Sequence, residues 1–173
     1  MKTLNHYLFI LVLLFFSVEN LNGQNSASPD TTNYKYGVGA GAGFTTGYGL
    51  SFRYTPSRCG VQFNFAPYHA SGTNIYSVGL TFLYRLVETH SANLFLYQGN
   101  HFYYNSQPVN YIDPNNNMQQ RRQTDQYFNN GLGIGIEFII VKRIGFNIMM
   151  GYAAYDNFNE VNFTGETGLY FKF

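Results

Sequence analysis

Apolar and polar residues alternate along most of the chain from Tyr34 to its last residue. A period of two is typical of β-strands, because successive side chains of a strand point to opposite faces. Turn residues divide this region into eight alternating segments without a helical period, at 34–44, 48–55, 61–69, 75–87, 94–104, 128–140, 144–155 and 162–173. Their lengths suit tilted strands that cross a bilayer, which take roughly 9 to 11 residues.

The two faces of most predicted strands differ in character. In segment 128–140, for example, Ile134 and Ile136 lie on the face opposite Gly135. The faces opposite the bulky ones hold mainly Gly, Ser, Thr and Asn with few charges, which suits a narrow lumen better than a solvated exterior. This favours a closed barrel with apolar side chains outward, since closure satisfies every backbone group in lipid. Segment 94–104 is apolar on both faces, and we predict a bulge near Gly99 and Asn100.

The glycines of the first predicted strand allow a second interpretation. Residues 37–42 satisfy G-x-G-x-x-A, the turn that binds a dinucleotide pyrophosphate. That site needs a helix after the glycines and an acidic residue about twenty positions further on. Here another strand-like segment follows, and no acidic residue occurs between Asp30 and Glu88. We therefore interpret the glycines as structural residues of the lumen face, where they leave room for larger side chains opposite.

The N-terminal region has the organisation of a secretory signal peptide. A basic start at Lys2 precedes the apolar run 8–18, and a polar stretch follows. The run is too short for a spanning helix, which needs about twenty apolar residues. We predict a cleavable signal peptide at 1–23, a short periplasmic segment at 24–33 and the barrel at 34–173.

The composition narrows the possible functions. Charged residues make up 11% of the chain and aromatic residues 19%, whereas soluble domains average about 25% charged residues. The net charge is +1, so we expect no nucleic-acid partner. The single cysteine, Cys59, excludes an internal disulfide framework. We expect no cofactor.

Six charged residues fall on the predicted lumen faces: Lys35, Arg53, Arg85, Glu137, Glu166 and Lys172. Buried charges of mixed sign must pair to offset their desolvation. We predict a salt-bridge cluster that closes the periplasmic part of the lumen, with Glu137 and Glu166 between the basic residues. A selectivity ring in a narrow channel is the alternative, although eight strands leave an interior that side chains can fill.

The long polar segment 106–126 is the predicted third outer loop and the expected site of any extracellular ligand. Its candidate interaction residues are Asp113, Arg121 and Arg122, and the arginines suit contacts with lipopolysaccharide phosphates. Asp113 also begins a sequence similar to a calcium loop, but Met118 replaces the required glycine. We therefore predict no metal site.

His69 and Ser71 form a His-x-Ser pair such as occurs in lipid A deacylases, which are eight-stranded outer-membrane barrels. No acidic residue is near the pair in the sequence, and a catalytic triad is recognised by geometry rather than by spacing. A small lipid-modifying enzyme therefore stays open as an alternative. A soluble lipocalin-like binder is another, and it requires the bulky faces to point inward.

The final segment, FTGETGLYFKF, resembles the C-terminal strand of Gram-negative outer-membrane barrels, which ends in an aromatic residue after alternating apolar positions. Leu169, Phe171 and Phe173 match that pattern. With the leader and the eight segments, the chain resembles the OmpA/OmpX-type small barrels. The resemblance implies an all-β, eight-stranded antiparallel up-and-down transmembrane barrel in the outer membrane. It also implies insertion by the outer-membrane assembly machinery, and contact with outer-membrane lipids and lipopolysaccharide. The leading hypothesis is a non-enzymatic protein with a structural or surface-interaction role through its outer loops.

Overall fold

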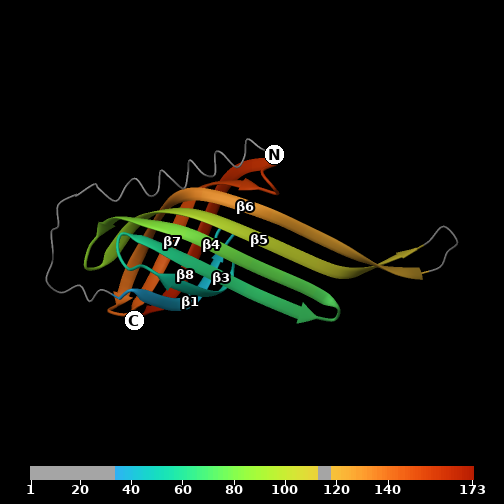
Figure 1. Cartoon of the computed structure of the whole chain (residues 1–173), viewed down its shortest axis with the longest axis horizontal. Coiled ribbons are helices and arrows are strands. Elements are labelled where there is room, and N and C mark those ends of the chain that lie inside the picture. Colours follow the sequence, from blue (N-terminus) through green and yellow to red (C-terminus); the bar gives the residue numbers. More distant parts are fainter. Residues whose placement is uncertain (1–33, 113–117) are drawn as a thin grey trace. The chain divides into compact units, whose positions relative to one another are not determined.

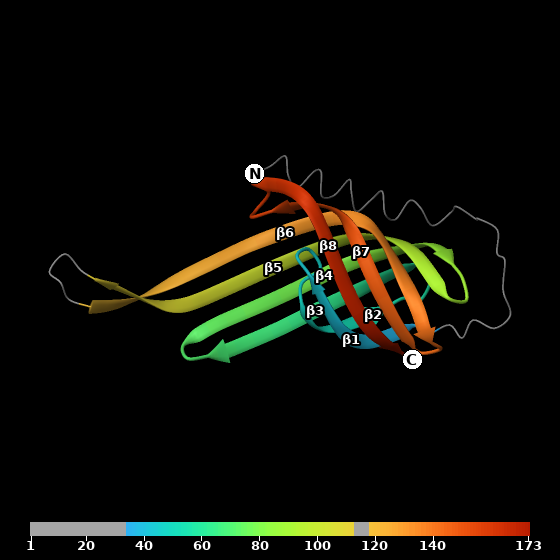
Figure 2. The same ribbon diagram turned by 180° about the vertical axis from the view of Figure 1, so that it is seen from behind.

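The computed structural model describes residues 34–112 and 118–173, and these form a closed antiparallel β-barrel (Figures 1 and 2). Each strand pairs with its neighbours in sequence, and β8 closes the ring on β1. The strands are β1 (Tyr36–Gly43), β2 (Gly49–Tyr54), β3 (Cys59–Ala70), β4 (Thr73–Glu88), β5 (Ala92–Ile112), β6 (Met118–Val141), β7 (Ile144–Tyr155) and β8 (Glu160–Lys172). The prediction of an eight-stranded up-and-down barrel is confirmed. The predicted signal peptide and the segment 24–33 lie outside the described residues.

The outer surface of the barrel is mainly apolar, and most of the polar side chains of the strands are buried inside it. Leu50, Leu132 and Leu169 are 74%, 61% and 51% exposed, whereas Asn64 and Thr81 are fully buried. A soluble protein would have the opposite arrangement, so the lipocalin-like alternative is wrong. The described residues include no helix of the length and hydropathy needed to cross a bilayer. The outer surface is that of a barrel surrounded by lipid.

β5 runs regularly through Gly99 and Asn100, so the predicted bulge at that place is wrong. The register instead shifts at Arg85–Val87 in β4 and at Ile139–Val141 in β6. The large apolar residues on the inner face of β5 are accommodated by glycines of β6. A side chain on Gly135 would lie 2.5 Å from the ring of Phe95. Both faces of β5 are therefore apolar because small residues on the neighbouring strand make room for aromatic rings.

The strands differ greatly in length, and the difference sets the shape of the barrel wall. β1 and β2 have 8 and 6 residues, whereas β5 and β6 have 21 and 24. Strands β3 to β6 therefore continue beyond the β1–β2 turn, and the β5–β6 hairpin extends furthest (Figures 1 and 2). We refer to this four-stranded continuation as the sheet extension, and to the end of the barrel that carries it as the extended end.

Most of segment 106–126, the predicted third outer loop, is paired strand rather than loop. β5 and β6 remain paired from Ser106 and Thr124 to Ile112 and Met118. The strand period is weak there because the hairpin has left the barrel, so neither face has to be consistently apolar. Only residues 113–117, which include the candidate Asp113, lie outside the described part of this hairpin.

Candidate functional site

An ionic cluster lies in the lumen near the end of the barrel where Tyr36 of β1 pairs with Phe173. Glu137 of β6 accepts hydrogen bonds from both basic partners, at 3.0 Å from Arg53 Nη1 and 2.6 Å from Lys172 Nζ. The Asn93 amide donates a third bond to the same carboxylate, at 2.9 Å. The side chains of Arg53 and Glu137 are only 7% and 6% exposed. We call Arg53, Glu137 and Lys172 the ionic cluster.

The ionic cluster crosses the bore of the barrel. β2 and β6, which carry Arg53 and Glu137, are four strands apart in either direction around the ring. Two guanidinium nitrogens of Arg53 also donate to Gln62 Oε1, at 3.2 and 2.6 Å. The guanidinium carbon lies 4.0 Å from the centre of the Tyr170 ring, within cation–π distance. Hydrogen bonds and an aromatic face thus hold this arginine across the lumen.

The other predicted members of the cluster lie elsewhere. Arg85 pairs with Glu88 at 2.7 Å, and the Glu88 side chain is 42% exposed. Lys35 is exposed and precedes β1. Glu166 lies opposite Gly43 of β1 and Met149 of β7, away from the cations. The prediction that Glu166 sits between basic residues is therefore wrong, and the cluster has one carboxylate.

Glu166 instead binds the β1–β2 turn, residues 44–48, whose central residues 45–47 fold into the lumen. The carboxylate accepts bonds from the backbone nitrogens of Thr45 and Thr46, at 3.3 and 3.0 Å. The hydroxyls of Thr45 and Thr164 also donate to it. Thr45 and Thr46 are 0% and 1% exposed. Backbone N–H groups thus supply the partners that sequence reasoning assigned to basic side chains.

The carbonyl groups of the turn are bound as well. Phe44 O accepts from His101 Nδ1 and from Asn129 Nδ2, both at 3.0 Å. Asn64 Nδ2 donates to Thr46 O at 2.9 Å. The side chains that hold the turn therefore come from strands on several sides of the barrel. We call residues 44–48 the lumen turn.

Glycines on the facing strands make space for the lumen turn. A Cβ atom on Gly79 would overlap the carbonyl oxygen of Thr46. One on Gly99 would lie 2.7 Å from Thr45 O, and one on Gly131 would lie 2.7 Å from the Thr45 side chain. These three glycines lie on β4, β5 and β6 and make room for backbone. The alternating glycines of β1 were expected to make room for larger side chains, and a Cβ on Gly41 or Gly43 would indeed meet the side chain of Asn64 or of Glu166.

The structure also shows a serine–histidine pair that sequence reasoning missed. Ser77 Oγ lies 2.9 Å from His101 Nε2, and the Tyr48 backbone nitrogen donates to the same hydroxyl at 3.1 Å. Ser77 and His101 are 0% and 1% exposed. The pair therefore holds the lumen turn in place, and because both side chains are fully buried, a substrate cannot reach them.

The sequence-predicted His-x-Ser pair lies at the tip of the β3–β4 hairpin. Ser71 and Gly72 have φ of 50° and 82°, as in a type I′ turn. His69 Nδ1 contacts the Asn74 side-chain oxygen. Within 34–112 and 118–173, no carboxylate is hydrogen-bonded to His69. The same residues contain no group of three His, Cys, Asp or Glu side chains placed to hold a metal ion.

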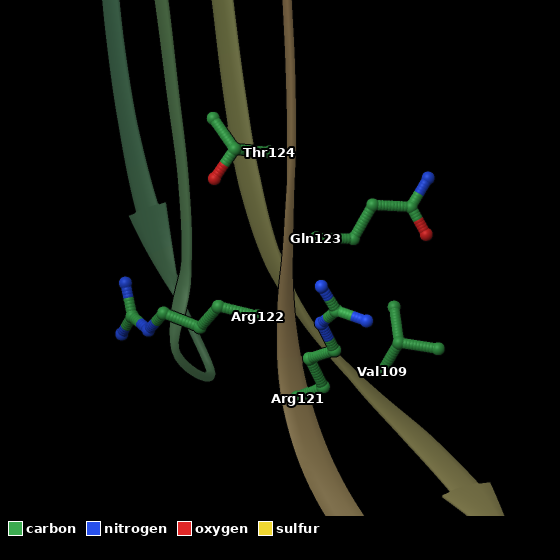
Figure 3. Close-up of a pocket in the computed structure, with 5 residues that line it drawn as sticks. All are labelled: Val109, Arg121, Arg122, Gln123 and Thr124. Atoms are coloured by element: carbon green, nitrogen blue, oxygen red, sulfur yellow. The ribbon is translucent and has the colours of Figure 1, made fainter.

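The two arginines of the β5–β6 hairpin point to opposite sides of β6 (Figure 3). Successive residues of a strand alternate between its faces, so Arg121 and Arg122 cannot clamp one phosphate together. A shallow hollow at the hairpin is lined by Val109, Arg121, Arg122, Gln123 and Thr124. Each arginine therefore offers a separate charge to the surroundings.

The C-terminal apolar residues face outward. Leu169, Phe171 and Phe173 are 51%, 46% and 51% exposed. The backbones of Phe173 and Tyr36 exchange two hydrogen bonds, at 3.1 and 2.9 Å, and thereby fasten the last residue to the first strand. Their role as an assembly signal stays a prediction.

Comparison with protein-family models and with curated proteins gives no match for this sequence. Among solved structures, the chain is similar to the N-terminal β-barrel domain of Pseudomonas aeruginosa OprF. The identity is 16% and the TM-score 0.46, over 80% of this chain and 95% of that one. A major outer membrane protein from Thermus thermophilus gives 16% identity and a TM-score of 0.46, over 80% and 98% of the two chains. Ail, the attachment invasion locus protein of Yersinia pestis, gives 16% and 0.41, over 80% and 93%. These values carry no conclusion about function.

Proposed function

We propose that the chain is a non-enzymatic outer-membrane barrel with a closed lumen, which presents the sheet extension at the cell surface for binding. The observation that carries the proposal is the combination of a blocked bore with strands that continue beyond it. With both termini periplasmic, the extended end lies outside the cell, together with its β3–β4 and β5–β6 hairpins. The outward apolar residues contact membrane lipid, and lipopolysaccharide surrounds the outer part of the barrel.

Two independent features support a closed lumen. The ionic cluster links opposite walls, and the lumen turn fills the bore at a second level. Narrow barrels of eight strands have interiors that side chains can fill completely. A channel would need a continuous polar path past both features.

The first expected result is that the refolded barrel carries no steady ionic current. In planar lipid bilayers, the current should stay at the leak level of protein-free membranes over the whole range of applied voltage. Insertion is checked independently by the faster gel mobility of the unboiled barrel. Stable, uniform conductance steps would contradict closure and favour the channel alternative.

The surface role is tested by shortening the β5–β6 hairpin. Replacing residues 107–123 by Asn-Gly joins Ser106 to Thr124, which are register partners, through a two-residue turn. We expect the barrel to fold normally and to lose binding of purified lipopolysaccharide and clumping of cells that display it. The double variant Arg121→Gln/Arg122→Gln is the matched control for charge alone, and it should lose only the salt-dependent part of the binding.

Undiminished binding and clumping of the shortened barrel would overturn the surface role. Mass spectrometry of lipopolysaccharide from the same cells tests the enzymatic alternative. An unchanged acyl-chain pattern is expected, and loss of an acyl chain in cells with the intact barrel would favour a lipid-modifying enzyme.

A further inference from the structure

Three amide side chains point to the outer, lipid-facing side of β5 and β6, where Gln98 is buried at 7% exposure and Asn100 and Asn130 are half-buried. Gln98 and Asn100 share this face of β5 with Leu96 and Phe102, one on each side of them along the strand. Asn130 of β6 is the direct register partner of Asn100. Alternate residues of a strand point the same way, so these amides stand within the apolar belt of the barrel.

The amides form a small network that leaves one member incompletely bonded. Asn100 Oδ1 accepts from Gln98 Nε2 at 3.0 Å and from Asn130 Nδ2 at 2.8 Å. Asn100 Nδ2 donates to Gln98 Oε1 at 3.1 Å and to Leu80 O at 3.3 Å. Asn100 thus uses its whole bonding capacity. In the part of the chain that the structure describes, the Asn130 side chain makes only its single bond to Asn100, and its carbonyl oxygen accepts none.

An unsatisfied amide in the hydrocarbon region has no water to bind, so its natural partner is another protein surface. An amide is self-complementary, because it carries both a donor and an acceptor. The Asn130 amide of a second copy can therefore donate to the free carbonyl oxygen of the first. In a dimer with two-fold symmetry, the same hydrogen bond also forms in the opposite direction. Neutral amides of one chain match those of its copy without any charge to neutralise.

The surroundings of Asn130 permit such an approach. Its register partner on β7 is the small residue Ala154, and small residues let neighbouring segments come close in membranes. Leu132 and Tyr152, a register pair beside it, are 61% and 70% exposed. We propose that this strip of β5, β6 and β7 is a dimer interface within the bilayer, in which Asn130 of one copy bonds Asn130 of the other.

Disulfide trapping in the outer membrane of expressing cells tests the position of the interface. In a Cys59→Ser background, Leu132→Cys lies beside Asn130, whereas Leu169→Cys on β8 is a matched lipid-facing control. Oxidation should link two copies through residue 132 and leave the residue 169 variant monomeric. The proposal would be overturned if the residue 132 variant stayed monomeric or became linked to a different protein. It would also be overturned if both variants were linked to the same extent. Heat-modifiable gel mobility establishes that each variant is folded.

The role of the amide is tested by Asn130→Leu, which keeps the position similar in size and removes its hydrogen-bonding groups. Each hydrogen bond between membrane segments contributes about 0.6 kcal/mol on average, so two symmetric bonds correspond to roughly a tenfold change in dimer dissociation constant. Sedimentation equilibrium in density-matched detergent micelles measures this constant. A dimer that is unaffected by the substitution would contradict the role of Asn130.

Discussion

Replacing Glu137 by Gln is expected to lower the free energy of unfolding of the barrel by about 3–5 kcal/mol, because it leaves the buried Arg53 and the partly buried Lys172 without a counter-charge. Arg53 and Lys172 both depend on this carboxylate, at 3.0 and 2.6 Å. Glutamine keeps the shape of the side chain, so the loss measures charge rather than packing. Urea unfolding of the barrel in lipid vesicles, followed by circular dichroism, gives the free energy.

Glu88→Gln is the matched control for the loss of one carboxylate. Its partner is Arg85, but the Glu88 side chain is 42% exposed, and exposed ion pairs contribute about 0–1 kcal/mol. A second variant, Arg53→Met/Glu137→Met/Lys172→Met, removes all three charges and should recover most of the lost stability. Equal effects of Glu137→Gln and Glu88→Gln would show that the ionic cluster does not act as a buried unit.

The second large effect is expected from Gly79→Val. A Cβ at this position overlaps the backbone oxygen of Thr46, and the backbone of a turn cannot rotate away as a flexible side chain can. Overpacking alone destabilises by about 1–3 kcal/mol. Displacing the lumen turn also removes the N–H partners of the buried Glu166 carboxylate, which adds to the loss. We expect both a lower free energy of unfolding and an outward movement of the turn.

Movement of the turn is measured by labelling Thr46→Cys with a water-soluble thiol reagent in a Cys59→Ser background. The residue is protected in the parent barrel, since Thr46 is 1% exposed, and should become reactive when Gly79→Val is added. Gly165→Val is the control, because no atom lies within 4 Å of a Cβ built there. Protection and stability that are the same in both glycine variants would contradict the role of Gly79.

Bilayer current distinguishes the contribution of the ionic cluster to closure of the lumen from that of the lumen turn. Glu137→Gln keeps the lumen turn and its glycine contacts, so the bilayer current should remain at the leak level although the barrel is less stable. Because glutamine still occupies the bore, opening both levels requires Arg53→Ala/Glu137→Ala together with Gly79→Val, and a current is then expected. A current in Glu137→Gln alone would assign closure to the ionic cluster only.

The alternation of side chains was sufficient to predict the strands and the direction of their faces. Each strand has only two faces, and a membrane barrel requires one of them to be apolar along its whole length. The prediction held for segments such as β7, whose bounds are those expected. It failed at the β5–β6 hairpin because strands that leave the membrane no longer need an apolar face. The two strands pair there through backbone hydrogen bonds, which require no particular pattern of side chains in the sequence.

The lumen could be predicted only in part. Local alternation placed Arg53, Glu137 and Lys172 on inner faces towards the periplasmic end, but it did not give the relative height at which lumen side chains of different strands meet. That height depends on the register of all neighbouring strands together. Glu166 illustrates the difference, since its inner face was predicted while its partners are backbone groups of residues 44–48, far away in sequence.

The sequence by itself determined the fold class, the number of strands and the outward apolar surface, because these follow from a period of two repeated along the chain. Only the tertiary structure decided which inward groups meet, that the short β1–β2 hairpin ends inside the bore, and that three amides gather on the lipid side. These features depend on how far each strand is displaced along its neighbours. That displacement is set by the pairing of all eight strands around the closed ring, so it cannot be predicted from the sequence of any single strand.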